Sequence, residues 1–451
     1  MPLSTLKIFR NAVVPIALLV ALLASAAGAA AQDQAPQPAA NASTTAVADG
    51  SPSPLTAAEV HDAHALAKAS NAFGVDLWKQ VATTPGNLAI SPASISAALA
   101  MTRGGAKGAT AKQIHKVMHL GGDADTDGKQ WGRLIEELQD PSLPRTLRIA
   151  NRLFGLNTLS FDQQFLNWTN VVFGAVLEPL PFNDAAEASR AHINAWVEDR
   201  TGHRIRDLLP PGSIDAATRL VLINAIYFHA DWQQPFEKQA TSQAPFHRLS
   251  PFPAEDVATM HSGNSFRAAM INDVKVLEVP YKGGDCTMLI VLPNKADGLA
   301  DVEKTLSAAM IETWLKALAW HQSNVALPRF ELDASAPSAL GDALRTLGMP
   351  LAFNPDKANF TGIAKPLHPK DRLFLGEVFH KAFVKVDEAG TEAAAATAGV
   401  MRTTAAPMPV SSEPPFEFRA DHPFLFFIID KSSGLILFMG RVSDPSVGGG
   451  A

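Results

Sequence analysis

Cysteine and runs of like charge are scarce in this sequence, and each scarcity excludes a class of protein. The 451 residues contain a single cysteine, Cys286, so no disulfide framework can form within one chain. The formal net charge is −6 and no long basic run occurs, which argues against nucleic acid as a partner. Cys286 opens the apolar, strand-like run Cys286–Pro293, and we interpret it as a buried, unreactive thiol.

The motifs of common enzyme families are also absent. The sequence has no G-x-S-x-G nucleophile elbow, no Walker loop, no Rossmann fingerprint and no H-E-x-x-H helix. His115 and His119 have the spacing of two metal ligands on one helix face. No acidic base accompanies them, so we interpret them as ordinary helix residues. We expect no catalytic residue, no metal and no cofactor; a hydrolase with a scattered active site is a distant alternative.

The N-terminal residues have the pattern of a secretory signal. Lys7 and Arg10 precede the apolar run Ala12–Leu23, and Ala29–Ala31 provides a small-residue cleavage pattern. We therefore predict a signal peptide at 1–31 and a secreted, extracellular protein, or a periplasmic one in a Gram-negative source. Once the signal is cleaved we expect no membrane attachment. The run is short for a membrane span, and an uncleaved anchor is the alternative.

The remaining chain divides into a linker, one domain and a short tail. Residues 32–54 are rich in Ala, Pro, Ser and Gln, which predicts a disordered linker. Residues 55–447 form the predicted domain, and 448–451 a flexible tail. With 47% hydrophobic residues the chain can bury a large core. Helical patterns come first and strand patterns dominate later, which indicates an α+β fold.

Several segments have clear local patterns. Asn87–Met101 predicts a short strand followed by a helix that starts at a Ser-Pro pair. Leu220–Phe228 is a continuous apolar run, typical of a strand buried on both faces. We also predict a helix through Gln113–Leu120, a strand through Leu373–Val386 and a core strand at Gly434–Val442.

One run of small residues near the C-terminus allows two interpretations. From Ala389 to Thr404 the only charged residues are Glu392 and Arg402. If the run forms a strand, alternate residues from Thr391 onward share an uncharged face and both charges lie on the other. Such a segment could enter between two existing strands. A flexible, Ala-rich linker is the alternative.

The segment Glu388–Ala398, which overlaps this run, resembles the reactive-loop hinge of the serpins, with the same Gly, Thr and small-residue tract between two strands. The resemblance covers the chain from about Glu59 to Pro445. It implies a serpin fold, with helices, three β-sheets and an exposed reactive-centre loop at about 388–415, held in a metastable state. The hinge residues would be Glu388, Gly390, Thr391, Glu392, Ala393, Ala394, Ala395, Ala396 and Thr397.

The resemblance also implies a mechanism and a partner. A serine protease attacks the exposed loop and forms an acyl-enzyme, and the freed hinge then inserts into the central sheet as a new strand. The expected partners are serine proteases, with cysteine proteases as a second class, bound to a monomer in a 1:1 covalent complex. The alternative is a non-inhibitory serpin-fold carrier or chaperone, whose hinge would hold bulky or charged residues.

The reactive bond follows from counting along the family pattern. Counting from Gly390 gives Thr404–Ala405, which would suit elastase- or subtilisin-like proteases. Counting back from Pro423 gives a bond near Ser412–Glu413, eight residues further along, so the loop is longer than usual. We favour the first count. The alternative residues are Met401 and Met408 (chymotrypsin-like proteases), Arg402 (trypsin-like proteases) and Thr403.

Two further groups of residues follow from the resemblance. The first, which we term the shutter cluster, is a polar group beneath the central sheet that controls its opening; its members are Ser91, Ser94, Asn224 and His380. The alternative is four unrelated polar groups. The second, the breach, lies where the hinge enters the sheet and contains Trp232, Arg329 and Glu388, with an ion pair between the last two.

Overall fold

The computed structural model describes residues 57–249, 251–333, 338–366, 368, 372–391 and 414–447. All of them belong to one compact unit, Leu55–Ala451. The predicted signal peptide (1–31), linker (32–54) and tail (448–451) lie outside the described residues. So do the hinge residues from Glu392 to Thr397 and the reactive-bond candidates Met401, Arg402, Thr403, Thr404, Ala405 and Met408.

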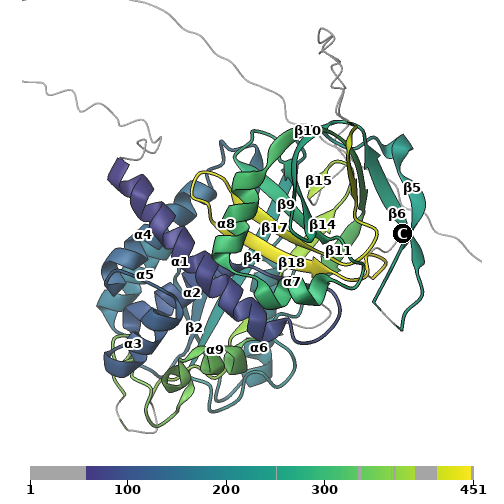
Figure 1. Cartoon of the computed structure of the whole chain (residues 1–451). Helices are drawn as coiled ribbons and strands as arrows, with labels where there is room; N and C mark the ends of the chain where they lie inside the picture. Colours follow the sequence, from purple (N-terminus) through teal and green to yellow (C-terminus); the bar gives the residue numbers. More distant parts are fainter. Residues whose placement is uncertain are drawn as a thin grey trace, which may run out of the picture. The chain divides into compact units, whose positions relative to one another are not determined.

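Most helices precede the main strands. They are α1 (Ala57–Val81), α2 (Pro92–Gly105), α3 (Gly108–Val117), α4 (Ala124–Leu138), α5 (Gln163–Phe173), α6 (Ala186–Arg200), α7 (Leu299–Thr305), α8 (Ala308–Ala317) and α9 (Gly341–Leu347). The predicted Ser-Pro start is confirmed, because the Ser91 side chain caps α2 by accepting a hydrogen bond from Ser94 N at 3.2 Å. Helices α3, α4 and α5 gather beside β2, away from β5 and β6 (Figure 1).

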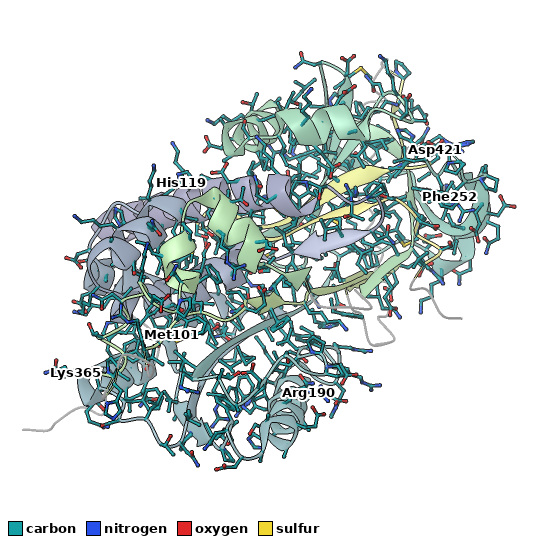
Figure 2. The ribbon with its side chains drawn as sticks, turned by 90° about the horizontal axis from the view of Figure 1, so that it is seen from below. Met101, His119, Arg190, Phe252, Lys365 and Asp421 are labelled. Atoms are coloured by element: carbon teal, nitrogen blue, oxygen red, sulfur yellow. The ribbon has the colours of Figure 1, made fainter. Side chains whose placement is uncertain are left out.

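The predicted helix through Leu120 ends early. Helix α3 stops at Val117, and His119 has a left-handed φ of 55°. His119, labelled in Figure 2, points its Nε2 atom at Asp76 Oδ2, 2.8 Å away. The interpretation of His119 as an ordinary helix residue is therefore wrong, because the chain reverses there ahead of two glycines, Gly121 and Gly122.

The central sheet has six strands in the order β11-β14-β15-β4-β2-β3. Their bounds are β2 (Arg145–Leu156), β3 (Leu177–Leu180), β4 (Leu220–Asp231), β11 (Phe330–Asp333), β14 (Phe383–Val386) and β15 (Gly390–Thr391). The predicted strand Leu220–Phe228 is confirmed as part of β4, which pairs antiparallel with β2 along almost its whole length.

Only part of the predicted strand Leu373–Val386 forms. It contains β13 (Phe379–His380) and β14, whereas residues 373–378 belong to no strand. Their backbone bonds to neighbouring loops instead: Leu375 N donates to Ala352 O at 2.8 Å, and Leu340 N donates to Val378 O at 2.9 Å. Satisfied backbone groups of this kind compete with a strand ladder.

A ten-stranded sheet makes up most of the rest. It contains β1 (Leu88–Ile90), β5 (Ser242–Phe246), β6 (Glu255–Ser262), β7 (Ser265–Ile271), β8 (Val274–Pro280), β9 (Cys286–Pro293), β10 (Ala319–Pro328), β16 (Phe416–Arg419), β17 (Phe424–Asp430) and β18 (Ile436–Val442). The first half of β10 pairs with β7, and the second half pairs with β6 and β16. The three predicted sheets thus correspond to the six-stranded central sheet and to the two halves of the ten-stranded sheet, which share β10. A two-stranded sheet of β12 (Ser338–Ala339) and β13 is additional.

Two apolar layers cover the two faces of the central sheet. On one face α2, buried along nearly its whole length, packs against β4 and β18. On the other face α6 contributes Ile193 and Val197 to a separate cluster that includes Phe154 of β2 and Phe383 of β14. Because both faces are covered, a new strand cannot lie across the sheet and must pair with existing strands, either between two of them or at an edge.

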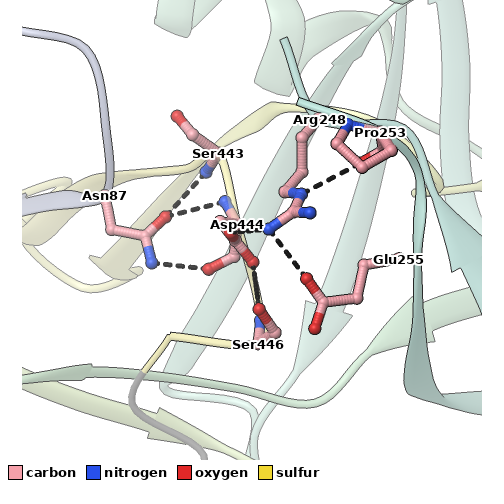
Figure 3. A network of polar contacts seen from close by, with 7 residues as sticks. All are labelled: Asn87, Arg248, Pro253, Glu255, Ser443, Asp444 and Ser446. Carbon is pink, nitrogen blue, oxygen red and sulfur yellow. Dashed lines mark hydrogen bonds and ion pairs between the residues drawn. The ribbon is translucent and has the colours of Figure 1, made fainter. Parts of the chain in front are cut away.

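The C-terminal segment is fixed to the domain by a polar network (Figure 3). Asn87 accepts from Ser443 N at 2.8 Å and donates to Asp444 O at 2.6 Å. Asp444 in turn pairs with Arg248 at 2.9 Å, and Arg248 also pairs with Glu255. Burial opposes ionisation of Asp444, but hydrogen bonds from Ser446 and Arg248 outweigh it and lower the pKa of this carboxyl.

Candidate functional site

The two hinge residues that the structure describes beyond Ala389 form β15, between β14 and β4 (Figure 1). Thr391 pairs with Val386 of β14 and with Ala230 of β4, and Gly390 pairs with Asp231, antiparallel on both sides. Further along, β4 and the chain leading into β14 meet directly and in parallel, at a bridge between Ile226 and Ala382. The sheet is therefore separated at one end only, and the hinge occupies that gap.

Gly390 is required for this approach. A Cβ atom on Gly390 would lie 2.1 Å from Ala230 O and 2.7 Å from Asp231 Cα. Both contacts are with backbone, which cannot move aside as a flexible side chain can. Glycine at this position therefore allows β15 to pair with β4.

The Thr391 side chain is buried, and its hydroxyl meets that of Tyr281. Its hydroxyl lies 2.6 Å from the Tyr281 hydroxyl, and the Tyr281 ring stacks on Trp232 with centroids 4.5 Å apart. Burial raises the pKa of Tyr281 well above its ordinary value, so its hydroxyl stays protonated.

Trp232 also holds the turn that precedes β15. Its indole Nε1 donates to Asp387 O at 2.9 Å, and its backbone N donates to Ala389 O at 2.8 Å. Phe236 N donates to the carbonyl oxygen of Glu388, at 2.9 Å. Three backbone carbonyls of the turn are thus bound by the chain that follows β4.

Glu388 and Arg329 form the ion pair that the resemblance implied. Arg329 Nε donates to Glu388 Oε1 at 2.8 Å, and the Thr241 hydroxyl donates to the same oxygen. The Glu388 side chain is 3% exposed and that of Arg329 is 45% exposed. Burial alone would raise the pKa of Glu388, but the bonds from Arg329 and Thr241 outweigh it and lower the pKa. Trp232, Arg329 and Glu388 thus lie together at the entry point.

The four residues of the shutter cluster also lie together, between α2, β4 and β13. Ser91 N donates to His380 Nε2 at 3.1 Å, and the Ser94 hydroxyl donates to Asn224 Oδ1. The Ser91 hydroxyl donates to Leu437 O at 2.6 Å. Complete burial lowers the pKa of His380 to about 4, so its ring is neutral and Nε2 can accept. The cluster ties the middle of the sheet to the start of α2.

Sequence reasoning missed three residues of these groups. Asn151 of β2 faces Asn224 in the β2–β4 register and accepts its Nδ2 hydrogen at 2.6 Å. Asn224, inside the otherwise apolar run of β4, was a usable signal, because a buried amide needs a partner such as Asn151. Thr241 and Tyr281 were not detectable, since neither belongs to a motif and each meets the hinge only through the fold.

The single cysteine is buried, and the described residues contain no cluster suited to a metal ion. Cys286 is fully buried, as predicted; burial raises the pKa of its thiol far above the ordinary value, although Arg145 Nη1 donates to Sγ at 2.6 Å.

Among the described residues, no group of three or more His, Cys, Asp and Glu side chains could hold a metal ion. Within that same part of the chain, no helix combines the length and apolarity needed to span a bilayer.

The chain is similar to many proteins of one family. The family model described as "Serpin (serine protease inhibitor)" matches residues 68–445. Leukocyte elastase inhibitor of Homo sapiens is 39% identical over 390 residues, covering 84% of this chain and 99% of that protein. The corresponding protein of Equus caballus is 40% identical over 390 residues, with the same coverage of 84% and 99%.

Solved structures agree. Uncleaved ovalbumin matches with a TM-score of 0.76 and 29% identity, over 84% of this chain and all of that one. Serpin48 of the insect Tenebrio molitor matches with a TM-score of 0.72 and 34% identity, over 84% and 98% of the two chains. With the hinge residues between β14 and β4, these similarities show that the chain belongs to the serpin family.

Proposed function

We propose that this chain inhibits serine proteases as a suicide substrate, forming a 1:1 covalent complex as a monomer. The observation that carries the proposal is the position of β15 between β14 and β4. The hinge already occupies the first two positions of a strand that the sheet can accept. Its two described residues there, Gly390 and Thr391, are small, as insertion requires.

The chemical step takes place in the loop that follows. The protease serine oxygen bonds to a carbonyl carbon of the loop, the C–N bond breaks, and the new amino terminus leaves with the proton from serine. We place this bond at Thr404–Ala405, with Met401, Arg402, Thr403 and Met408 as alternative positions. The acyl-enzyme ester then joins the protease to the hinge.

Insertion then separates β4 from β14. Glu392, Ala393, Ala394, Ala395, Ala396 and Thr397 continue β15 antiparallel to both neighbours, and the Ile226–Ala382 bridge must open to admit them. A dozen inserted residues add ladder hydrogen bonds worth about 0.5–1.5 kcal/mol each. Their sum is on the order of ten kcal/mol, comparable with the whole stability of a domain, about 5–15 kcal/mol. The uncleaved form is in this sense metastable.

The two residue groups have different roles in this scheme. The breach pair Arg329–Glu388 and the Trp232 contacts hold the turn from which the inserting strand starts. The shutter cluster joins α2 to β4 and to His380, so its bonds resist the separation of the sheet. We propose that the balance between them sets the rate at which the hinge inserts.

An elastase-like serine protease is the first target to test. Two relatives at 39–40% identity carry the name leukocyte elastase inhibitor, and Thr404 has the small side chain that such proteases prefer. Cysteine proteases are a second class to include. Thyroxine-binding globulin, 26% identical with a TM-score of 0.74, shows that a similar fold can serve as a carrier. The carrier alternative predicts bulky or charged hinge residues, and Gly390 and Thr391 are neither.

A protease panel read by SDS gel tests the proposal. An inhibitor gives a band that survives boiling, at the mass of the protease plus the chain without its C-terminal peptide. Mass spectrometry of the released C-terminal peptide locates the cut. Clean cleavage without a stable band would favour the carrier alternative. Cleavage of the loop by a non-target protease should also raise the resistance to heating, because the hinge then inserts.

We also propose that the protein is secreted after removal of residues 1–31. Support comes from the sequence pattern alone. Amino-terminal sequencing of the protein from the medium, or from the periplasm of a Gram-negative source, should begin at Gln32. A product that starts at Met1 and stays in the membrane fraction would contradict this.

A further inference from the structure

A groove lies along the open edge of β2, on the far side of β4 from the hinge. Strand β3 pairs with β2 only from Leu153 to Leu156, so among the described residues no strand borders the preceding part of β2 on that side. The groove has a volume of about 330 Å³ and runs between the C-terminal ends of α5 and α6. This is within the size range of small-ligand sites, about 300–1,000 Å³. We call it the β2 groove.

The charged side chains that line the β2 groove are all arginines: Arg148 and Arg152 from β2, and Arg200 from the last turn of α6. None of the described residues that line the groove is acidic. Within the described part of the chain, Arg148 and Arg200 have no ion-pair partner, although Arg148 lies over the Tyr227 ring at 6.0 Å. Arg152 pairs with Glu178 at 2.8 Å. On a chain of net charge −6, this is a local concentration of positive charge.

Three nitrogen donors in the lining residues have no acceptor among the described residues. They are Arg152 Nε, Trp196 Nε1 and Asn151 Nδ2, and the Asn151 residue is only 7% exposed. An unpaired buried donor costs about 1–3 kcal/mol, so such groups normally have a partner. Each of these three atoms is a hydrogen-bond donor without an acceptor in that part of the chain. Arg152 and Trp196 lie on the α6 face of the sheet, whereas the neighbouring Asn151 points to the opposite face, toward Asn224. One acceptor in the groove could therefore serve only Arg152 and Trp196.

Apart from Gln139, whose Oε1 accepts from Ile149 N at 2.8 Å, the rest of the lining is apolar. Phe173, Ile149, Ala150 and Val176 line the groove, and the Trp196 ring packs over the Arg152 guanidinium at 5.3 Å. Val176 is 52% exposed, and Val171 on the adjoining α5 is 82% exposed. A ligand with an apolar body would cover this surface, which water now contacts.

We propose that the β2 groove binds a small carboxylate with an apolar body, such as a medium-chain or aryl carboxylate. The carboxylate accepts from Arg148 and Arg200 at the rim. As Arg152 and Trp196 turn toward it, their covered N–H groups gain the acceptor that they lack. Charge-assisted bonds of this type are among the strongest hydrogen bonds in proteins. The apolar body lies on Phe173, Val176 and the Trp196 ring.

Calorimetric titration of the mature chain with octanoate tests this directly. We expect one saturable site, with binding at least tenfold weaker for octanol, which lacks the charge, and for acetate, which lacks the apolar body. Octylammonium should not bind. If octanoate shows no saturable binding up to millimolar concentration, or if octanol or acetate binds as tightly, the proposal is wrong.

Two single variants locate the site. Arg148→Gln and Arg200→Gln each remove an exposed cation, so both should fold normally, and each should weaken octanoate binding about tenfold. Lys316→Gln, which removes an exposed cation on α8, is the matched control and should leave the affinity unchanged. Equal effects of all three variants would show that net charge alone attracts octanoate and would overturn the assignment.

A third variant tests the role of the indole donor. Trp196→Phe keeps an aromatic ring but removes Nε1, and it should weaken octanoate binding while octanol binding stays the same. An equal loss for both ligands would mean that Trp196 contributes only apolar surface. Because these titrations involve no protease, their outcome is independent of the proposed inhibitory function.

Discussion

The Tyr281 hydroxyl lies 2.6 Å from the Thr391 hydroxyl, and both residues are almost completely buried. Tyr281→Phe leaves the Thr391 hydroxyl without this partner, and we expect the free energy of unfolding to fall by about 1–3 kcal/mol. Thr391→Val should cost a similar amount. If the bond matters, the double variant loses less than the sum of the two, with a coupling of about 1 kcal/mol in urea denaturation. Strictly additive losses would show that the two hydroxyls act independently.

Thr391→Arg should convert the chain from inhibitor to substrate. The inserted side chain is 1% exposed beneath Tyr281, and an unpaired guanidinium buried there costs several kcal/mol. Insertion would then be slower than deacylation, so the protease would release a cleaved chain. The SDS-stable complex should be lost, whereas Thr391→Ser, which keeps the hydroxyl, should retain it. Complex formation by Thr391→Arg at the parent's stoichiometry would show that this face is not buried on insertion.

The Arg329–Glu388 pair should respond unequally to removal of its two members. Arg329→Gln leaves the buried Glu388 carboxylate without its cation, and we expect a loss of about 1–2 kcal/mol, less than for a fully buried pair because Arg329 is half exposed. Glu388→Gln should cost less, since the freed guanidinium is solvated.

The pH dependence of stability gives a second readout of this pair. The pKa of Glu388 is lowered from 4.5 in the folded chain, so its contribution is present above pH 4.5 and is lost as pH falls through the folded value. Arg329→Gln should reduce that acid-dependent loss. Urea midpoints at neutral pH test the ranking of the two variants. If Glu388→Gln were less stable than Arg329→Gln, the unpaired Arg329 guanidinium would be costlier than the unpaired Glu388 carboxylate.

Local signals in the sequence determined much of the fold. The Ser91-Pro92 pair predicts the start of α2 because a serine cap and a proline at the first helical position favour a helix start. The apolar run Leu220–Phe228 predicts β4 because no amphipathic alternation interrupts it. In both cases the interactions that decide the structure lie within a few residues of one another.

The contacts at the hinge could not be predicted in this way. Tyr281 and Thr391 are 110 residues apart, and they meet only because the β8–β9 hairpin turns beside Trp232. No periodicity encodes that turn. The strand predicted at residues 373–378 does not form, for a related reason. The apolar pattern favours a strand, but the Leu375 amide donates its hydrogen bond to the distant Ala352 carbonyl instead.

His380 should make stability depend on pH between about 4 and 6.5. Its pKa falls from 6.5 to about 4 in the folded chain, so within this range the unfolded chain binds more protons than the native one. Its contribution is therefore complete above pH 6.5 and is lost as pH falls toward 4, by about 3 kcal/mol at most. Protonation would also break the bond from Ser91 N to Nε2.

Urea midpoints from pH 7.5 to 4.5 measure this effect. His380→Gln should flatten the slope relative to the parent chain, whereas His368→Gln, at an exposed position outside the shutter cluster, should leave it unchanged. If the two variants had the same slope, His380 would not be the group that titrates.

Gly390→Ala tests whether the hinge must pass this close to β4. The added methyl group would lie 2.1 Å from Ala230 O, so β15 cannot pair in its present register. We expect the variant to be cleaved as a substrate, with at least a tenfold drop in the yield of SDS-stable complex. Gly376→Ala is the matched control, because a Cβ there meets no atom within 4 Å and should leave the yield unchanged. If Gly390→Ala still formed the complex at the parent's yield, the inserting strand would have to take another register, and the pairing of Gly390 with Asp231 could not be the first step of insertion.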